Sequence, residues 1–218
     1  MFFWRKKKAK REDDKIWATK ELKLRGIGEE ISRALAQNDP VLVVGHFEKT
    51  MEELKAVLDA KNLRYRVAQT DLDLSHLDQG ETRLTLLSSE NISGSTSADH
   101  PLPGRDDPQG KKIDIVVVEH YPLPERDQAV LSFAQRLPLA STVCFHVSLD
   151  EPLLSLFGVE SVVGLLKRLG WDETRSVSHP MITAAIASVQ KRIKKSAFGD
   201  QRVQSMEEWF SYNYPSSR

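Results

Sequence analysis

Short apolar runs alternate with amphipathic stretches along the first two thirds of the chain. The run at residues 41–45 is rich in β-branched residues and continuously apolar, which is typical of a strand buried on both faces of a parallel sheet. Five strands are predicted in all, at residues 41–45, 64–68, 83–88, 113–118 and 142–149. Because helical spacing separates several of them, the pattern predicts an α/β fold with a mostly parallel sheet.

Helical spacing is found first at residues 15–38, where Ile16 and Trp17 begin a series of apolar positions. This helix is expected to end at Asn38-Asp39-Pro40, since the residue before proline leaves the α region. Thr50, with Glu53 three residues later, fits a capping box that opens a second helix. Asn62 is its expected end, and a third helix is predicted at residues 124–137.

Beyond Asp150 the spacing becomes helical throughout. Apolar residues recur at 153–157, at 162–169 and, after His179-Pro180, to about residue 198. These segments predict a helical C-terminal extension of the sheet. Residues 89–112 are rich in Ser, Gly, Asp and Pro, so we predict a mobile loop there.

Charge is distributed unevenly along the chain, with an excess of basic residues at the N-terminus. The 218 residues carry no net charge, yet residues 1–11 hold six basic and no acidic side chains. The remainder holds 25 basic against 31 acidic residues, which disfavours nucleic-acid binding by the body of the protein. No stretch approaches the ~20 apolar residues of a membrane span, and no apolar stretch follows the first charges as in a secretory signal. We expect a cytoplasmic protein.

The tip at residues 1–14 combines aromatic rings with these charges. Rings of this kind insert at the headgroup level, and basic residues attract anionic lipid. A membrane contact is the first interpretation, a solubilising tail the second, and polyanion binding through charge and stacking the third. The residues concerned are Phe2, Phe3, Trp4, Arg5, Lys6, Lys7, Lys8, Lys10 and Arg11.

Other side chains offer little chemistry. The one cysteine, Cys144, lies in an apolar run and is expected to be a buried structural thiol. Glu119-His120 follows a predicted strand at the end where α/β sites form, but no nucleophile or phosphate cradle accompanies the pair in the sequence. The six histidines lack metal-ligand spacing, and Asp71, Asp73 and Asp78 fit a solvated loop better than a cation site. No metal and no cofactor are expected.

The C-terminal third resembles SecA, the ATP-driven motor of bacterial protein export. Residues 145–158 are similar to the family's "FYLSLEDDLMRIFG", residues 162–170 to "VSGMMRKLGM", and residues 179–192 to "HPWVTKAIANAQRK". Their order and spacing match almost without gaps. Upstream, residues 40–49 resemble "PVLVGTISIEKSE", and residues 113–128 align with the segment that leads to the arginine-finger motif.

This resemblance implies a RecA-like fold of the P-loop NTPase second-lobe type. It divides the chain into the tip at residues 1–14, a degenerate second motor domain at 15–150 and the start of a helical scaffold at 151–218. The resemblance also implies two ATPase motifs. Where the family has "NMAGRGTDI", residues 88–95 lack the Gly-Arg-Gly-Thr-Asp core. Where it has "QLRGRSGRQGD", Arg136 alone survives among residues 129–139.

The sequence also contains no Gly-x-x-x-x-Gly-Lys-Ser/Thr loop to bind phosphates. An arginine finger contributes about 10³–10⁵ to the rate of phosphoryl transfer, so its loss argues against ATP hydrolysis. We therefore predict a catalytically inactive, SecA-like protein-interaction module, an accessory of export at the inner membrane surface. Its expected partners are SecA or translocon components.

Two alternatives stay open. In one, the chain completes the ATP site of a partner P-loop subunit through Arg136, its only nucleotide-binding candidate. In the other, it is a helicase-like nucleic-acid-binding protein. The outer helices of the C-terminal third are also expected to expose apolar faces, which a partner or a second copy would cover.

Overall fold

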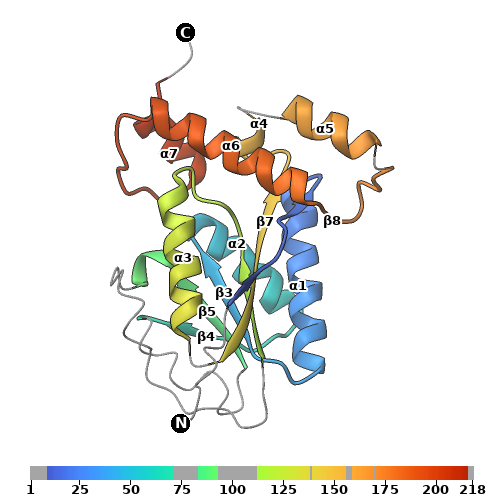
Figure 1. Cartoon of the computed structure of the whole chain (residues 1–218). Helices are drawn as coiled ribbons and strands as arrows, with labels where there is room; N and C mark the ends of the chain where they lie inside the picture. The colour runs from blue at the N-terminus through green and yellow to red at the C-terminus, as the bar shows by residue number, and fades with distance from the viewer. Residues whose placement is uncertain are drawn as a thin grey trace, which may run out of the picture.

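The computed structural model describes residues 9–70, 83–92, 112–137, 139–155, 159–168 and 170–215. An eight-stranded sheet runs through this part of the chain, in the order β4-β5-β3-β6-β7-β2-β8, and β1 also pairs with β7 (Figure 1). The five predicted strands are confirmed and parallel to their neighbours: β3 (Val41–Gly45), β4 (Arg66–Ala68), β5 (Leu84–Ser88), β6 (Lys112–Val117) and β7 (Ala140–Ser148). The predicted α/β class with a mostly parallel sheet is therefore confirmed.

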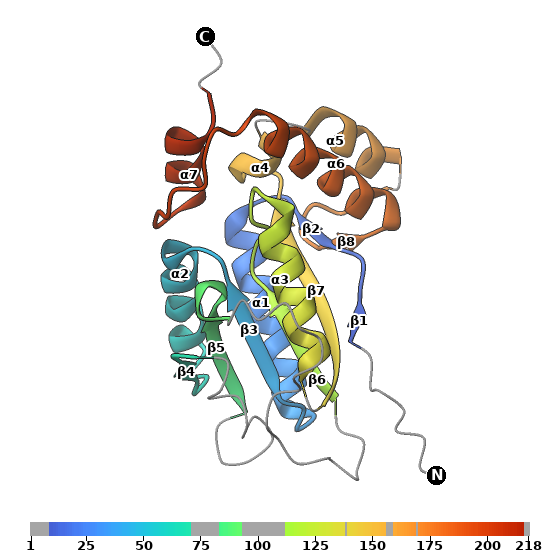
Figure 2. The same ribbon diagram turned by 60° about the vertical axis from the view of Figure 1, so that its left-hand side comes forward.

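Helices cover both faces of the sheet. On one face, α1 (Lys20–Ala36) and α2 (Glu48–Ala60) pack on Val41, Val43 and Leu86. On the other face, α3 (Pro124–Arg136) packs on Leu42, Val44 and their neighbours in β6 and β7. Figure 2 shows α3 in front of the strands and α1 behind them. Adjacent residues of β3 thus face opposite layers, which explains its unbroken apolar sequence.

The N-terminal segment differs from the prediction. Residues 15–38 are not one helix, because β2 (Lys15–Trp17) is a strand and α1 begins only at Lys20, where Thr19 accepts a hydrogen bond from the Leu22 amide. Residues of the expected tip also join the sheet as β1 (Lys10–Arg11). Both strands run parallel to β7. Ile16 and Trp17 are buried, as predicted, but they are buried by strand pairing.

Two predicted helix ends are confirmed and one predicted helix start is wrong. Asn38 and Asn62 adopt positive φ values of 65° and 55°, as expected for residues that end helices. The capping box at Thr50 is wrong, because α2 begins at Glu48 and Thr50 is buried inside its first turn. Of the predicted loop, Ser89–Asn91 form a short 3₁₀ helix, η2, and residues 93–111 lie outside the described part of the chain.

The C-terminal third forms the predicted helical extension. It contains α4 (Pro152–Ser155), α5 (Val159–Arg168), α6 (Pro180–Ser196), α7 (Met206–Asn213) and a short strand, β8 (Val177–Ser178), antiparallel to β2. These helices share one apolar cluster with Ile16, Phe47 and Val147 of the sheet region. The extension therefore covers the end of the sheet above the carboxyl ends of its strands (Figure 1).

Two glycines of α1 provide a test of the packing between β2 and the helix. A Cβ atom on Gly26 would lie 1.9 Å from Cη2 of Trp17, whereas one on Gly28 would lie 3.1 Å from flexible atoms of Lys61 and Val57. We expect Gly26→Ala to lower the free energy of unfolding by about 1–3 kcal/mol through overpacking.

Gly28→Ala is the matched control in the same helix. Its clash is small, and alanine improves helix propensity by up to about 1 kcal/mol, so we expect little change or a gain in stability. Urea denaturation of both variants measures the difference. Equal effects of the two substitutions would contradict the close contact between Trp17 and Gly26.

Candidate functional site at the carboxyl edge of the sheet

The carboxyl ends of β3, β5 and β6 bring polar side chains to one edge of the sheet. His46 follows β3, Ser88 ends β5 and Ser89 begins η2 directly after it, and Glu119-His120 follows β6. The connection from β3 leads to α2 on one face and that from β6 leads to α3 on the other. The crevice between β3 and β6 is thus the topological switch point at which open α/β sheets bind ligands.

Glu119 fills the centre of this crevice. Its Oε1 accepts hydrogen bonds from the backbone amides of His46, at 3.1 Å, and Phe47, at 3.0 Å. Phe47 is the N-cap residue of α2 and has no capping side chain of its own. The Glu119 carboxyl group therefore takes the place at a helix N-terminus that favours a bound anion. Burial raises its pKa, while nearby Lys23 opposes the shift.

His120 is held between two carboxylates. Its Nδ1 lies 2.6 Å from Oδ2 of Asp127, and its Nε2 lies 3.2 Å from Oδ2 of Asp14. Burial alone would lower the pKa of His120, but Asp127 and then Asp14 raise it to about 10. The imidazole is therefore a cation at neutral pH, enclosed between two anions in the interior.

Asp14 reaches this position through a β-bulge. Between the pairs Arg11–Val143 and Lys15–His146, the N-terminal arm advances four residues while β7 advances three. An extra residue of this kind redirects side chains, and here Asp14 is fully buried. Its amide donates to Thr183 of α6 at 2.8 Å. The network therefore links the arm, the β6–α3 connection and the C-terminal extension.

Asp127, in the first turn of α3, is the hub of the network. It accepts hydrogen bonds from the Tyr121 amide at 3.0 Å and from Gln190 Nε2 at 2.6 Å. Burial would raise its pKa, but His120 and also His46 hold the pKa well below the usual range. Its carboxylate therefore stays charged at neutral pH.

A second histidine contacts this hub from the side of β3. Nε2 of His46 lies 3.0 Å from Oδ1 of Asp127, without the alignment of a full hydrogen bond. Its Nδ1 lies 2.8 Å from Oγ of Ser89, which is half-buried. Ser89, His46 and Asp127 thus form a line from the surface to the interior.

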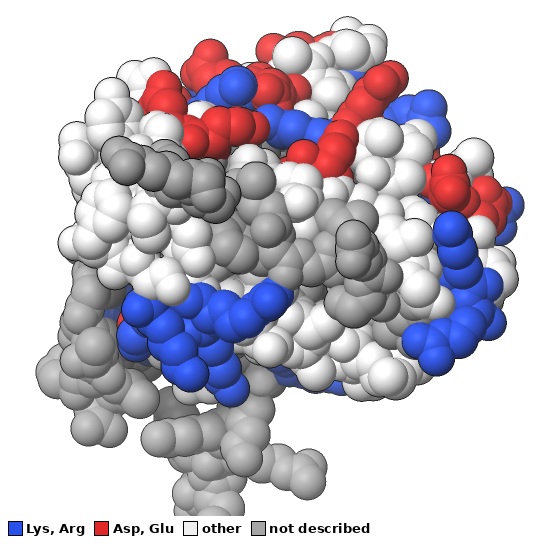
Figure 3. Space-filling model, turned by 90° about the horizontal axis from the view of Figure 1, so that it is seen from above, with Lys and Arg blue, Asp and Glu red and all other residues white. Residues whose placement is uncertain are grey.

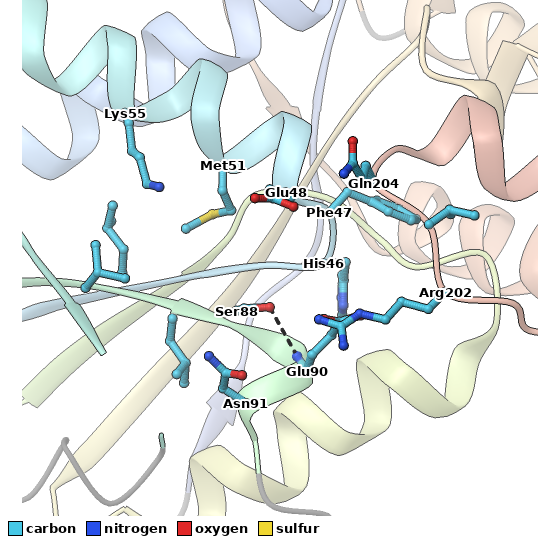
Figure 4. Close-up of a pocket in the computed structure, with 14 residues that line it drawn as sticks. His46, Phe47, Glu48, Met51, Lys55, Ser88, Glu90, Asn91, Arg202 and Gln204 are labelled. Atoms are coloured by element: carbon cyan, nitrogen blue, oxygen red, sulfur yellow. Dashed lines mark hydrogen bonds and ion pairs between the residues drawn. The ribbon is translucent and has the colours of Figure 1, made fainter. Parts of the chain in front are cut away.

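Two neighbouring cavities open onto this edge. The larger, of about 530 Å³, is lined by the apolar side chains of Met51, Val67 and Leu86 and by polar side chains that include Lys55, Ser88 and Asn91. Figure 4 shows Met51 and Lys55 projecting from α2, and Ser88 and Asn91 near the end of β5. The smaller, of about 250 Å³, is lined by His46, Ser89, Tyr121, Arg126 and Arg202. Both cavities include Glu90 and Arg202 in their walls, and these two side chains form an ion pair.

The segment between α6 and α7 crosses above the crevice. The carbonyl of Gln204 accepts a hydrogen bond from the Lys49 amide at 3.1 Å. Asp200 accepts hydrogen bonds from the side chains of Tyr121, Arg126 and Trp209. Phe47 stacks on Tyr121 with ring centroids 5.4 Å apart, and Trp209 meets Tyr121 edge-on. The chain's own C-terminal residues therefore cover part of the switch point, over Phe47 and Tyr121.

The residues singled out from the sequence are not brought together here. Arg136 lies in the last turn of α3, which leads to the start of β7 at the opposite edge of the sheet, and it is 6% exposed. Phe2, Phe3, Trp4, Arg5, Lys6, Lys7 and Lys8 lie outside the described residues, as do Asp71, Asp73 and Asp78. Lys10 and Arg11 are in β1, and Arg11 pairs with Asp14 at 2.9 Å. Cys144 is buried, and burial raises its pKa to about 12.

Sequence reasoning noted Glu119-His120 but missed Asp14, Asp127, His46 and Ser89. The single signal for this site was the position of Glu119-His120 at a strand end. Within the part of the chain that the structure describes, no helix is long and apolar enough to span a membrane, and no group of three side chains is suited to hold a metal ion.

No family model matches the sequence. Among solved structures, similar chains include the C-terminal part of the Fun30 ATPase domain and the Hef helicase domain of Pyrococcus furiosus. The first covers 79% of this chain and 54% of its own, with a TM-score of 0.43 and 10% identity. The second covers 59% and 25%, with a TM-score of 0.40 and 17% identity.

Curated relatives are SecA subunits. The protein translocase subunit SecA of Lachnoclostridium phytofermentans is 26% identical over 190 residues, which cover 86% of this chain and 22% of that protein. SecA of Syntrophomonas wolfei is 27% identical over 199 residues, covering 86% and 23%. The chain spans about a fifth to a quarter of the length of these relatives. The resemblance noted in the sequence is confirmed: over most of its length, this chain is similar to part of SecA.

Proposed function

We propose that this chain is a SecA-related protein-interaction module that does not hydrolyse ATP and that assists protein export at the inner membrane surface. The observation that carries the proposal is the position of the Glu119 carboxyl group at the N-terminus of α2. Glu119 accepts the amides at the N-terminus of α2, where a phosphate would otherwise gain most from the helix. A nucleotide phosphate would have to displace a buried carboxyl group from that position.

The surface of the C-terminal extension supports a role in protein contacts. Seen from above, Lys and Arg side chains gather over the C-terminal half of α6, whereas the opposite side carries Asp and Glu side chains with Lys and Arg among them (Figure 3). Lys191, Lys194 and Lys195 are exposed there, followed by Phe198, which is 69% exposed. Aromatic side chains are enriched at protein interfaces, so Phe198 is the residue of this surface that we assign to a protein contact.

Two measurements test the proposal. Purified protein with Mg²⁺ and ATP is expected to release no phosphate above the buffer rate, and ATP hydrolysis that Arg136→Ala abolishes would overturn the proposed inactivity. An affinity pull-down from native extract is expected to recover SecA or translocon subunits.

The pull-down is best run with the full chain and with a version lacking residues 1–8. This cut removes most of the basic tip and leaves β1 and the Arg11–Asp14 pair intact. Recovery of export components with both versions assigns the contact to the folded body. Recovery of only RNA-bound proteins, and only with the full chain, would contradict an export role.

A further inference from the structure

The line Ser89–His46–Asp127 has the composition and order of a nucleophile, a base and an orienting carboxylate. Oγ of Ser89 lies 2.8 Å from Nδ1 of His46, and Nε2 of His46 lies 3.0 Å from Asp127. Catalytic triads are recognised by these roles and distances rather than by order in the sequence. The two ring nitrogens exchange roles relative to the usual triad: the serine is next to Nδ1 and the carboxylate is next to Nε2.

The charge state of Asp127 sets the tautomer of His46 that this role needs. Because the negative charge of Asp127 lies 3.0 Å from Nε2, it favours the tautomer with the proton on Nε2, which leaves Nδ1 unprotonated toward Ser89. Asp127 is itself fixed by the Tyr121 amide and by Gln190. The hydroxyl group of Ser89 therefore faces a base whose ring orientation is fixed by buried groups.

Ser89 is half-buried and lines the smaller cavity together with Arg126 and Arg202. Both guanidinium groups are in ion pairs, Arg126 with Asp200 and Arg202 with Glu90. The larger cavity next to it is lined by the apolar side chains of Met51, Val67 and Leu86. The two spaces suit a substrate with a polar reacting group at Ser89 and an apolar chain against those side chains.

We propose that Ser89 is the nucleophile of an acyl-transfer site that hydrolyses esters of small apolar acids. Oγ of Ser89 attacks the ester carbonyl carbon while its proton passes to Nδ1 of His46. The bond to the alcohol then breaks, and the alcohol leaves with that proton. A water molecule, deprotonated by the same nitrogen, attacks the acyl group and releases the acid and free Ser89.

A matched pair of serines tests the proposal. Ser211 is exposed on α7 and lines neither cavity, and its hydroxyl group donates a hydrogen bond to the Glu208 carbonyl at 2.8 Å. A fluorophosphonate probe is expected to label the wild-type protein and Ser211→Ala, but not Ser89→Ala. Hydrolysis of p-nitrophenyl butyrate is expected to follow the same pattern and to fall about 10²–10⁴-fold in His46→Gln. Absence of labelling in the wild-type protein, or equal labelling of Ser89→Ala, would overturn the proposal.

A second measurement does not depend on the choice of substrate. In Ser89→Cys, the basic Nδ1 of His46 should favour the thiolate, so iodoacetamide should react at least about tenfold faster at pH 7 than with Ser88→Cys. The native Cys144 is buried and contributes a slow background. Equal rates for the two variants would show that His46 activates nothing at position 89.

This inference is independent of the proposed role in export. Ester hydrolysis needs neither nucleotide nor a partner protein, so failure of the labelling experiment leaves the pull-down result untouched. Loss of export components from the pull-down would likewise leave the assignment of Ser89 unaffected.

Discussion

Replacing His120 by leucine is expected to lower the free energy of unfolding by about 3–5 kcal/mol. His120 is 1% exposed and is the cation between Asp14 and Asp127, both of which are buried. Without it, two carboxylates face each other in the interior with less compensation. Urea denaturation at pH 6, followed by tryptophan fluorescence, measures the loss.

Two further variants make this test specific. Lys194→Ala removes an exposed ion pair with Glu125 and should cost no more than about 1 kcal/mol. Adding Asp14→Asn to His120→Leu should restore part of the lost stability, since it removes one uncompensated charge. A loss below about 1 kcal/mol in His120→Leu would show that the three groups do not act as a charged network.

The same network predicts a pH dependence with a definite sign. The pKa of His120 is raised from 6.5 to about 10 in the folded protein. Its stabilising contribution is therefore fully present below pH 6.5 and is lost as the pH rises toward 10. The stability difference between wild type and His120→Leu should shrink by about 1.4 kcal/mol per pH unit above pH 6.5. A constant difference between pH 6.5 and 8.5 would contradict a charged His120.

The strand β3 could be predicted from the sequence because a strand buried on both faces has an unbroken run of apolar residues. Val41–Gly45 is apolar at every position, since α1 and α2 cover one face and α3 the other. Lys15–Trp17 has no such run, and its sequence predicts a helix although the segment is a strand. It has three residues, its apolar positions continue the helical spacing of α1, and its partner in β7 lies far along the chain. Local periodicity carries no information on such a pairing.

The candidate site could be predicted from the sequence even less than the strands. Glu119-His120 is recognisable as a polar pair at a strand end, but the carboxylates that pair with His120 come from distant parts of the chain or from the following helix. Asp14 is placed by a bulge in the pairing with β7, and Asp127 accepts a hydrogen bond from Gln190 of α6. Sequence patterns mark an acidic residue in the first turn of a helix, such as Asp127, as solvated or dipole-stabilising. The inward position of Asp14 depends on a pairing with residues far along the chain, so neither carboxylate could be identified in advance.

Trp209, in the C-terminal helix α7, is expected to contribute strongly to the stability of the fold. This side chain is fully buried, lies edge-on to Tyr121 and donates from Nε1 to Asp200 at 2.9 Å. Trp209→Ala is expected to cost about 3–5 kcal/mol, as for other buried tryptophans. Tyr212→Ala, on the same helix but at a side chain 57% exposed, should change stability by no more than about 0.5 kcal/mol.

The consequence for the switch point follows from where Trp209 acts. It anchors the residues between α6 and α7, which cover Phe47 and Tyr121 above Glu119. Trp209→Ala should therefore speed proteolytic cleavage within residues 197–205 more than Tyr212→Ala does, under conditions where both proteins remain folded. Unchanged cleavage together with a small loss of stability would mean that the extension is a separate appendage. The obstruction of the crevice would then have to be attributed to Glu119 alone.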